Sequence, residues 1–458
     1  MRITNLNPTD GIGASAWLIE IDGHRLLLDA GTDPRHEGYR SLPLYDQVQN
    51  AEVDAIAITH CHHDHIGSLP IAMRRFPRAH VLMTHLSYFL AERVLHNSVN
   101  VMVRQRDELG VSEYPLYSHD EVDELAPRFQ GFRYEREIEW AALHKSRAGL
   151  PSPTLEFFDA GHTLGSAGIL VRGKRETLFY TGDVSFRDQT ILKGARFEDV
   201  QADVVILETT RGAQVVPEGF TREAEEERLL AAIKRVLKRK GSVLIPAFAL
   251  GRTQEVLALL ALWMQQGKLR RQPVYVGGLG RVFTEIYDLE AHRTHRHHTN
   301  LQLHEALDLI VVDPQTVQTI KLTGSHIFVV TAGMMNEYTA AHDLALRMFH
   351  DDRHAILFVG YADPDTPGGR LKASEPGKPF RFSEVVGETT RYCELAEFDL
   401  TAHANREELL DFAAEVAEHT VVLAHGAPAA RHWFATELSK SRPRLRLLQP
   451  GPGETIEV

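Results

Sequence analysis

Short apolar runs of strand length, separated by turn residues, fill the first 60 residues and return between about 155 and 208. WLIEI (17–21) and HRLLL (24–28) are two of these runs, and Asp22-Gly23 between them predicts a tight hairpin. This pattern predicts that both segments contribute mainly β-strands.

A different pattern occupies the middle of the chain. Apolar runs such as SVLIPAF (242–248) alternate there with helical stretches at roughly 221–240 and 253–267, and such alternation indicates a parallel sheet. From about 393 the first pattern returns, with a strand in ELAEFDLTA (394–402), an amphipathic helix, and a strand in TVVLA. We therefore expect an α/β protein in which one domain is built from 1–208 and 393–458 and a second α/β domain is inserted at 209–392.

The stretch 66–150 is harder to interpret. It starts as a helix at 66–76, and a second helical pattern follows at 85–95. The stretch could form a lid over a site, but a plain surface insertion is the simpler interpretation.

Composition narrows the function classes. The formal net charge of −12 argues against a broadly basic protein that coats nucleic acid. A nuclease is still compatible with it, because bound metal ions attract phosphate even on an acidic body. Two cysteines, Cys61 and Cys393, make a disulfide framework unexpected and favour a reducing, cytoplasmic setting. The sequence shows no signal-peptide pattern and no apolar stretch of about 18 residues, so no membrane association is expected.

The densest chemical motif is an HxHxDH sequence that follows the apolar run DAIAIT and precedes a predicted helix. Its four polar positions are His60, His62, Asp64 and His65. In an extended loop, residues two apart project to the same side, so these side chains can converge. Imidazole nitrogen and carboxylate oxygen are the ligand types of catalytic zinc sites. Cys61 and His63 lie between the ligands and are interpreted as spacers.

Other apolar runs each end in one acid or histidine, namely His162, Asp183, Glu208, His403 and His425. The carboxyl edge of a sheet in α/β folds is where ligands usually bind. One histidine after a strand is most often a buried or rim residue without a function. Six such cases together, one of them the HxHxDH loop, predict a site with more than one metal.

These motifs resemble the β-CASP nucleases of the metallo-β-lactamase fold, which include bacterial RNase J and the pre-mRNA 3′-end cleavage endonuclease. The matching segments are LLLDAG with Asp29, THCHHDHIGSLP (59–70), DAGHTLGSAG (159–168), YTGDVS (180–185), ILETT with Glu208, LTAHAN with His403, LAHG with His425, and IPAFALGRTQE (245–255). The resemblance covers nearly the whole chain and implies an αββα sandwich with an inserted β-CASP domain.

The resemblance also implies a ligand set for two Zn²⁺ ions per chain. His60, His62 and His162 would hold one ion, Asp64, His65 and His425 the other, and Asp183 would bridge them. Asp29 would order the HxHxDH loop through hydrogen bonds. Zinc is inferred from ligand type, and manganese or iron could occupy the same ligands.

Hydrolysis of a phosphodiester also needs a proton for the leaving oxygen. The resemblance assigns this role to His403, with Glu208 orienting the imidazole and favouring its protonated form. His403 and His425 lie 425 − 403 = 22 residues apart with one helix between them. We interpret this spacing as a βαβ unit that places two strand ends side by side. Catalytic roles are thus expected for Asp64, Asp183, Glu208 and His403.

The expected function is a zinc-dependent ribonuclease, endonuclease or 5′-exonuclease, that uses a water activated by two metals. Single-stranded RNA would bind in the cleft between the domains, and a homodimer is compatible with the sequence. A histidine at 425, where DNA-processing relatives usually have valine, resembles the RNA-processing branch. The alternatives are a DNA nuclease of the same fold, a small-molecule hydrolase such as a lactonase or thioesterase, and an inactive scaffold of an RNA-processing complex.

Some positions depart from the family pattern. Ala427 replaces the glutamate usual after the last His-Gly, and Asn336 and Glu337 replace a glycine pair. A histidine cluster that the family lacks could contact phosphate or bind a further metal, although a surface loop is the simpler interpretation. The cluster consists of His292, His295, His297, His298 and His304.

Overall fold

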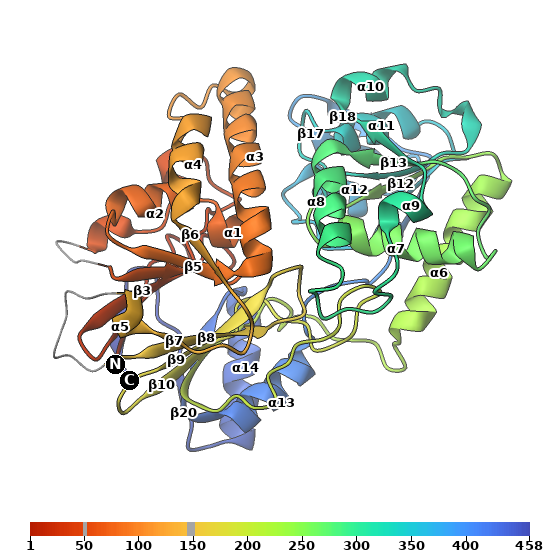
Figure 1. The fold of residues 1–458 in the computed structure, drawn as a ribbon. Coiled ribbons are helices and arrows are strands. Elements are labelled where there is room, and N and C mark those ends of the chain that lie inside the picture. The colour runs from red at the N-terminus through yellow and green to blue at the C-terminus, as the bar shows by residue number, and fades with distance from the viewer. Residues whose placement is uncertain (49–52, 144–151) are drawn as a thin grey trace. The chain divides into compact units, whose positions relative to one another are not determined.

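The computed structural model describes residues 1–48, 53–143 and 152–458. The chain forms two compact units, shown as ribbons in Figure 1. The first unit comprises Met1–Asp188, Gly194–Val216 and His403–Val458, and the second comprises Gln189–Lys193 and Pro217–Ala402.

In the residues that the structure describes, two seven-stranded sheets form the body of the first unit. One has the order β22 (Thr455–Glu457), β1 (Arg2–Asn5), β2 (Trp17–Ile21), β3 (His24–Leu28), β4 (Ala55–Ala57), β5 (His80–Thr84), β6 (Phe129–Phe132). The other has the order β21 (Arg446–Leu448), β20 (Ala417–Ala424), β11 (Ala202–Glu208), β10 (Thr177–Tyr180), β9 (Ala167–Arg172), β8 (Thr154–Asp159), β7 (Ile138–Glu139). The predicted hairpin joins β2 and β3, and Asp22 and Gly23 both have positive φ, as a type I′ turn requires.

The two sheets pack face to face. Alternate residues such as Ile19 and Leu28 of the first sheet share one buried cluster with Phe157 and Ile169 of the second. The outer face of the second sheet packs against α13 (Arg406–Val416) and α14 (Pro428–Ser441), where Phe179 contacts Phe412. Each fully buried phenylalanine of this kind contributes about 1.5–3 kcal/mol through removal of apolar surface from water.

The outer face of the first sheet is covered by helices from the HxHxDH loop and from the stretch 66–150. These are α1 (His63–Ile66), α2 (Leu69–Arg75), α3 (His85–Leu109) and α4 (His119–Leu125) (Figure 1). In α3, Leu90, Leu95 and Val99 are buried on one face, so this helix is a layer of the fold rather than a lid or a surface insertion. The described part of the chain thus has the expected αββα order. The end of the stretch 66–150, from residue 144 on, lies outside the described residues.

The second unit has the expected parallel sheet. Its strand order is β14 (Leu309–Val312), β13 (Val274–Gly277), β15 (Ile327–Val330), β12 (Val243–Pro246), β16 (Ala355–Phe358), β19 (Glu394–Glu397). The two predicted helices are α6 (Arg222–Lys238) and α7 (Arg252–Gln265). Within the described ranges, no helix is both long and apolar enough to cross a lipid bilayer.

Strand β19 differs from the expectation. Residues 394–402 were assigned to the first domain, but β19 pairs in parallel with β16 and belongs to the sheet of the second unit. The last unit boundary therefore lies at Ala402/His403 instead of 392/393, and the earlier one lies at Val216/Pro217 instead of 208/209. The predicted βαβ unit is wrong for the same reason, because β19 and β20 lie in different sheets.

Candidate metal centre

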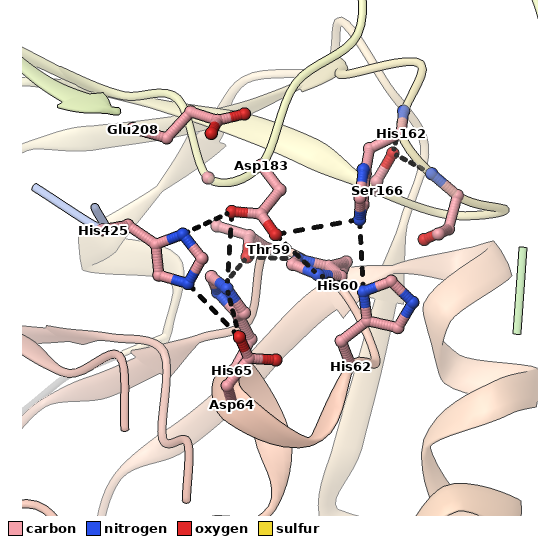
Figure 2. A network of polar contacts seen from close by, with 12 residues as sticks. Thr59, His60, His62, Asp64, His65, His162, Ser166, Asp183, Glu208 and His425 are labelled. Carbon is pink, nitrogen blue, oxygen red and sulfur yellow. Dashed lines mark hydrogen bonds and ion pairs between the residues drawn. The ribbon is translucent and has the colours of Figure 1, made fainter. Parts of the chain in front are cut away.

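The polar strand ends meet at one edge of the sandwich in the first unit. Strands β8, β10, β11 and β20 all run in the same direction, because β8 and β10 are each antiparallel to β9, while β10, β11 and β20 are mutually parallel. His162, Asp183 and His425 lie in the turns after β8, β10 and β20, and Glu208 is the last residue of β11. The HxHxDH loop after β4 faces them from the other sheet (Figure 2).

Three histidines and one carboxylate form a first group of ligand atoms. Nε2 of His60 and Nε2 of His162 each lie 3.1 Å from Nδ1 of His62. Oδ2 of Asp183 lies 3.7 Å from both Nε2 atoms. These atoms all lie within 4.8 Å of one another, which is compact enough to surround one cation.

A second group lies on the other side of the same aspartate and comprises Asp64, His65 and His425. Oδ1 of Asp183 lies 3.5 Å from Nε2 of His65 and 3.2 Å from Nδ1 of His425. Nε2 of His425 lies 3.2 Å from Oδ2 of Asp64. The two oxygens of Asp183 therefore face different groups, as Figure 2 shows.

The residues present fit two zinc ions. Bonds of about 2.0–2.1 Å in a tetrahedral site separate the ligand atoms by about 3.4 Å, close to the spacings in both groups. Nε2 of His65 and Oδ1 of Asp183 are buried and have no hydrogen-bond partner. Such atoms are costly to bury unless a cation contacts them.

Electrostatics keep Asp64, Asp183 and His60 in the forms that bind metal. Burial opposes ionisation of Asp64 and Asp183, but His65 and His425 hold the pKa of both carboxyls below the usual range. Burial and the charge of His65 lower the pKa of His60, which stays neutral. Burial opposes protonation of His65 and His425, but Asp183 and the neighbouring carboxylates raise the pKa of both rings, that of His65 to about 10. Carboxylates and neutral imidazoles are the forms that ligate zinc, so these two rings must lose a proton when metal binds.

Asp29 fixes the HxHxDH loop from behind. Its Oδ1 accepts a hydrogen bond from the backbone N–H of Thr59 at 2.7 Å. Its Oδ2 contacts Nδ1 of His65 at 2.8 Å and accepts the hydroxyl of Tyr180 at 2.8 Å. Because Nδ1 of His65 is held by Asp29, Nε2 points at the centre.

Cys61 and His63 are more than spacers. The thiol of Cys61 donates to the carbonyl of Ser87, and Nε2 of His63 lies 2.8 Å from Oγ of Ser98. Both serines lie on α3, 98 − 87 = 11 residues or about three turns apart, so the helix holds the loop at two points. Burial raises the pKa of Cys61 to about 12, so the thiol stays protonated and able to donate.

Close backbone packing also sets the loop position. A Cβ on Gly31 would lie 1.8 Å from the carbonyl oxygen of Asp64, so only glycine fits there. His425 has φ 46° at the end of β20, and the following Gly426 packs against the backbone of Thr209. These constraints turn the imidazole of His425 toward Asp183.

Glu208 and His403 form a pair beside the first ligand group. Oε1 of Glu208 lies 3.3 Å from Nδ1 of His403, and the His403 ring is tilted by 54° against that of His162, with 4.6 Å between the ring centroids. The loop of His403 is anchored by the backbone hydrogen bond from Ala404 to Val184, beside Asp183. The structure thus brings together every residue that the sequence placed at the site, although the expected strand before His403 ends at Glu397 and joins the sheet of the second unit.

Comparison with known families is consistent with this geometry. The family model described as the metallo-beta-lactamase superfamily matches residues 9–239. The chain belongs to this superfamily. A Beta-Casp domain is matched at 253–371, and a domain described as a Zn-dependent metallo-hydrolase RNA specificity domain at 390–444. The resemblance to the β-CASP branch is thereby confirmed.

Several curated relatives within the superfamily are similar over most of this chain. Cleavage and polyadenylation specificity factor subunit 3 of Dictyostelium discoideum is 26% identical over 97% of this chain and 55% of its own length. A probable RNase of Methanocaldococcus jannaschii is 28% identical, covering 92% of this chain and 93% of its own. A ribonuclease of Thermus thermophilus is 29% identical, covering 93% of each. The chain spans about half the length of the first of these relatives.

A solved structure of a protein of unknown function from Enterococcus faecalis V583 shares the fold. Its TM-score is 0.56 at 12% identity, over 100% of this chain and 99% of that chain.

The unusual histidine cluster lies in the second unit, within and near the segment between α8 (Gly278–Leu289) and α9 (Leu303–Ala306). Nδ1 of His304 contacts Asp288 at 3.0 Å, and Arg296 donates to the carbonyls of Tyr287 and Leu301. Within the described ranges, none of the five histidines joins a group of ligand atoms with metal-site spacing. These contacts give the segment a structural role.

Proposed function

We propose that this superfamily member is a zinc-dependent ribonuclease that hydrolyses RNA phosphodiester bonds. The observation that carries the proposal is the position of Asp183 between two ligand groups, with the Glu208–His403 pair beside them. Two relatives, one named as a probable RNase and the other as a ribonuclease, support RNA as the substrate. The description of the third matched domain, which refers to RNA specificity, agrees with them.

His60, His62 and His162 would hold one zinc ion, Asp64, His65 and His425 the other, and Asp183 would contact both. When bound, the two ions would supply a water of lowered pKa and neutralise charge on the phosphoryl oxygens. Asp29 and Thr59 would keep His65 and His60 in the tautomers that present Nε2 to the ions.

His403 is proposed as the general acid. Burial alone would lower the pKa of His403, but the charge and hydrogen bond of Glu208, with the charge of Asp183, raise it overall. Oε1 of Glu208 also accepts the backbone N–H of Val184 at 2.9 Å, and Oε2 accepts that of Thr210 at 3.2 Å. With the carboxylate fixed and Nδ1 facing it, Nε2 is the ring nitrogen that delivers a proton to the leaving oxygen.

One further observation favours RNA rather than DNA as the proposed substrate. A histidine occupies position 425, and its two ring nitrogens face Asp64 and Asp183. Its resemblance to the RNA-processing branch, together with the names of the relatives, favours single-stranded RNA. A cytoplasmic location is proposed because Cys61 and Cys393 are free thiols, as a reducing compartment would keep them. The homodimer stays a prediction.

Metal removal and restoration test the proposal. The purified protein is dialysed against a chelator and then supplied with two equivalents of Zn²⁺, and cleavage of a labelled single-stranded RNA is followed in each state. We expect cleavage to be lost with the metal and to return with zinc, and Asp183→Asn to stay inactive in both states. Zinc binding without cleavage of RNA or DNA would instead indicate a scaffold, and cleavage that survives metal removal would contradict the proposed chemistry.

A further inference from the structure

Two helices of the first unit present a second set of metal-ligating side chains, away from the HxHxDH loop. On α3, Glu92, His96 and Asn100 follow each other at intervals of four residues and so share one face. On α4, His119 and Asp123 have the same spacing. The two helices lie side by side (Figure 1). His96 of α3 contacts both His119 and Asp123 of α4.

One ring nitrogen of His96 faces two carboxylates. Nε2 lies 3.1 Å from Oδ1 of Asp123 and 3.9 Å from Oε1 of Glu92. One ligand atom from each of these three residues lies within 4.8 Å of the others. The other ring nitrogen, Nδ1, lies 2.8 Å from Nδ1 of His119, and the two rings are stacked with an interplanar angle of 22°.

The hydrogen bonds that link His96, His119 and Asn100 assign a tautomer to each imidazole. Nε2 of His119 lies 3.2 Å from Oδ1 of Asn100, an oxygen that only accepts, so His119 donates through Nε2. Its Nδ1 is then an acceptor, and the proton between the two rings must belong to Nδ1 of His96. In this tautomer, Nε2 of His96 directs a lone pair at Asp123 and Glu92.

A lone pair directed at two carboxylates is repulsive unless a positive charge lies between them. Either a second proton on His96 or a metal cation can supply that charge. The geometry matches a metal-binding histidine whose other nitrogen donates to a fixed acceptor, an arrangement that orients the ring and makes it a stronger ligand. The side chains of Glu92 and Asp123 are 46% and 64% exposed, so water can complete the coordination.

We propose that Glu92, His96 and Asp123 bind a divalent transition-metal ion of the zinc class, with His119 and Asn100 orienting the imidazole. One nitrogen and two carboxylate ligands suit such a cation. The site is separate from the centre around Asp183, and its proposal is independent of the ribonuclease activity.

An ion at this site would join two helices of the layer that holds the HxHxDH loop. α3 carries Ser87 and Ser98, which hold Cys61 and His63 of the HxHxDH loop. α4 is held to α2 by the ion pair between Glu121 and Arg74. An ion joining α3 to α4 would therefore stabilise the helical layer that positions the loop.

Zinc titration of four purified proteins tests this site: the wild type, His96→Ala, Asp123→Asn, and His432→Ala as a control for loss of an exposed histidine. Free Zn²⁺ is buffered from nanomolar to micromolar, bound zinc is counted by native mass spectrometry, and circular dichroism verifies folding. The readout is the difference in bound zinc per chain between the four proteins. The number of ions bound at the centre around Asp183 is common to all four and cancels. We expect the wild type and His432→Ala to bind one more ion than His96→Ala, and Asp123→Asn to bind that ion at least tenfold more weakly.

The proposal would be overturned if either His96→Ala or Asp123→Asn bound this ion with unchanged affinity. Equal zinc counts in all four proteins would overturn it as well. Equal counts would leave a second proton on His96 as the positive charge. Because Asp123 is mostly exposed, its substitution separates loss of a ligand from loss of folding.

Discussion

Oε1 of Glu208 lies 3.3 Å from Nδ1 of His403, and the same carboxylate accepts backbone N–H groups from Val184 and Thr210. Glu208 is 1% exposed, so its position is set by the strand end and by these bonds rather than by solvent. The pair therefore has a fixed orientation beside the ligand groups. A proton donor held in this way should act on the rate without holding metal.

His403→Ala is expected to retain both zinc ions and to lower kcat for RNA cleavage by about 10²–10⁴, the usual contribution of a general acid. Single-turnover cleavage and zinc content are measured on the same preparation. His432→Ala, which removes an exposed histidine from α14, should match the wild type in both. Undiminished cleavage by His403→Ala would remove this residue from the mechanism.

Asp183→Ala should have the opposite profile, losing metal together with activity. Its two oxygens face both ligand groups, so the substitution removes a ligand from each and removes the carboxylate that lies between the two groups. Zinc content after gel filtration is the measurement, with Asp411→Ala on an exposed face of α13 as the control. A fully loaded Asp183→Ala protein would show that the aspartate does not bridge.

Asp29→Asn tests whether the hydrogen bonds of Asp29 hold the HxHxDH loop and orient His65. An amide cannot accept from Thr59, Tyr180 and His65 as a carboxylate does, so the orientation of His65 should loosen. We expect zinc affinity to fall about 10–100-fold. Competition with a chromogenic chelator measures this, and Asp46→Asn, an exposed substitution in the same unit, should leave the affinity unchanged.

Asp159 gives a stability prediction that depends on pH. Burial raises the pKa of Asp159 from the usual 3.8 to about 7, partly offset by the backbone N–H of Gly161 and by Arg196. Because the folded-state pKa is the higher one, the stabilisation is complete below about pH 4 and is lost as the pH rises through 7. Asp159→Asn keeps an acceptor for Gly161 and cannot ionise.

Metal-free Asp159→Asn should therefore gain stability relative to the wild type between pH 4.5 and pH 8, by at most about 4 kcal/mol. Urea unfolding at the two pH values gives this difference. The exposed Asp199→Asn should show no such change. A constant difference between Asp159→Asn and the wild type at both pH values would show that the carboxyl has an ordinary pKa.

The sequence predicted the site better than it predicted the connections. Acids and histidines after strand ends predicted that His162 and Asp183 lie together, because β8 and β10 run in the same direction and end at one edge of their sheet. His60 follows β4 of the other sheet, and its place at the same centre was predicted from the resemblance. The run 394–402 was misplaced because a strand pattern does not say which sheet the strand joins, and β19 joins that of the second unit.

The roles of Cys61 and His63 could not be predicted for a related reason. Their partners Ser87 and Ser98 lie on α3. The sequence of the HxHxDH loop does not predict which helix packs against the loop. The two serines share the apolar face of α3, and small polar residues on a buried face are the only signal of this contact in the sequence.

The central claim is cleavage of RNA by the site around Asp183 and His403, and matched labelled strands test it most directly. The zinc-loaded protein is incubated with a 5′-labelled single-stranded RNA and with a DNA of the same sequence, and His403→Ala is treated in parallel. We predict cleavage of the RNA, with internal fragments for an endonuclease or mononucleotides for a 5′-exonuclease, and loss of this cleavage in the variant. Cleavage of the DNA alone, or of neither strand while zinc is bound, would contradict the account.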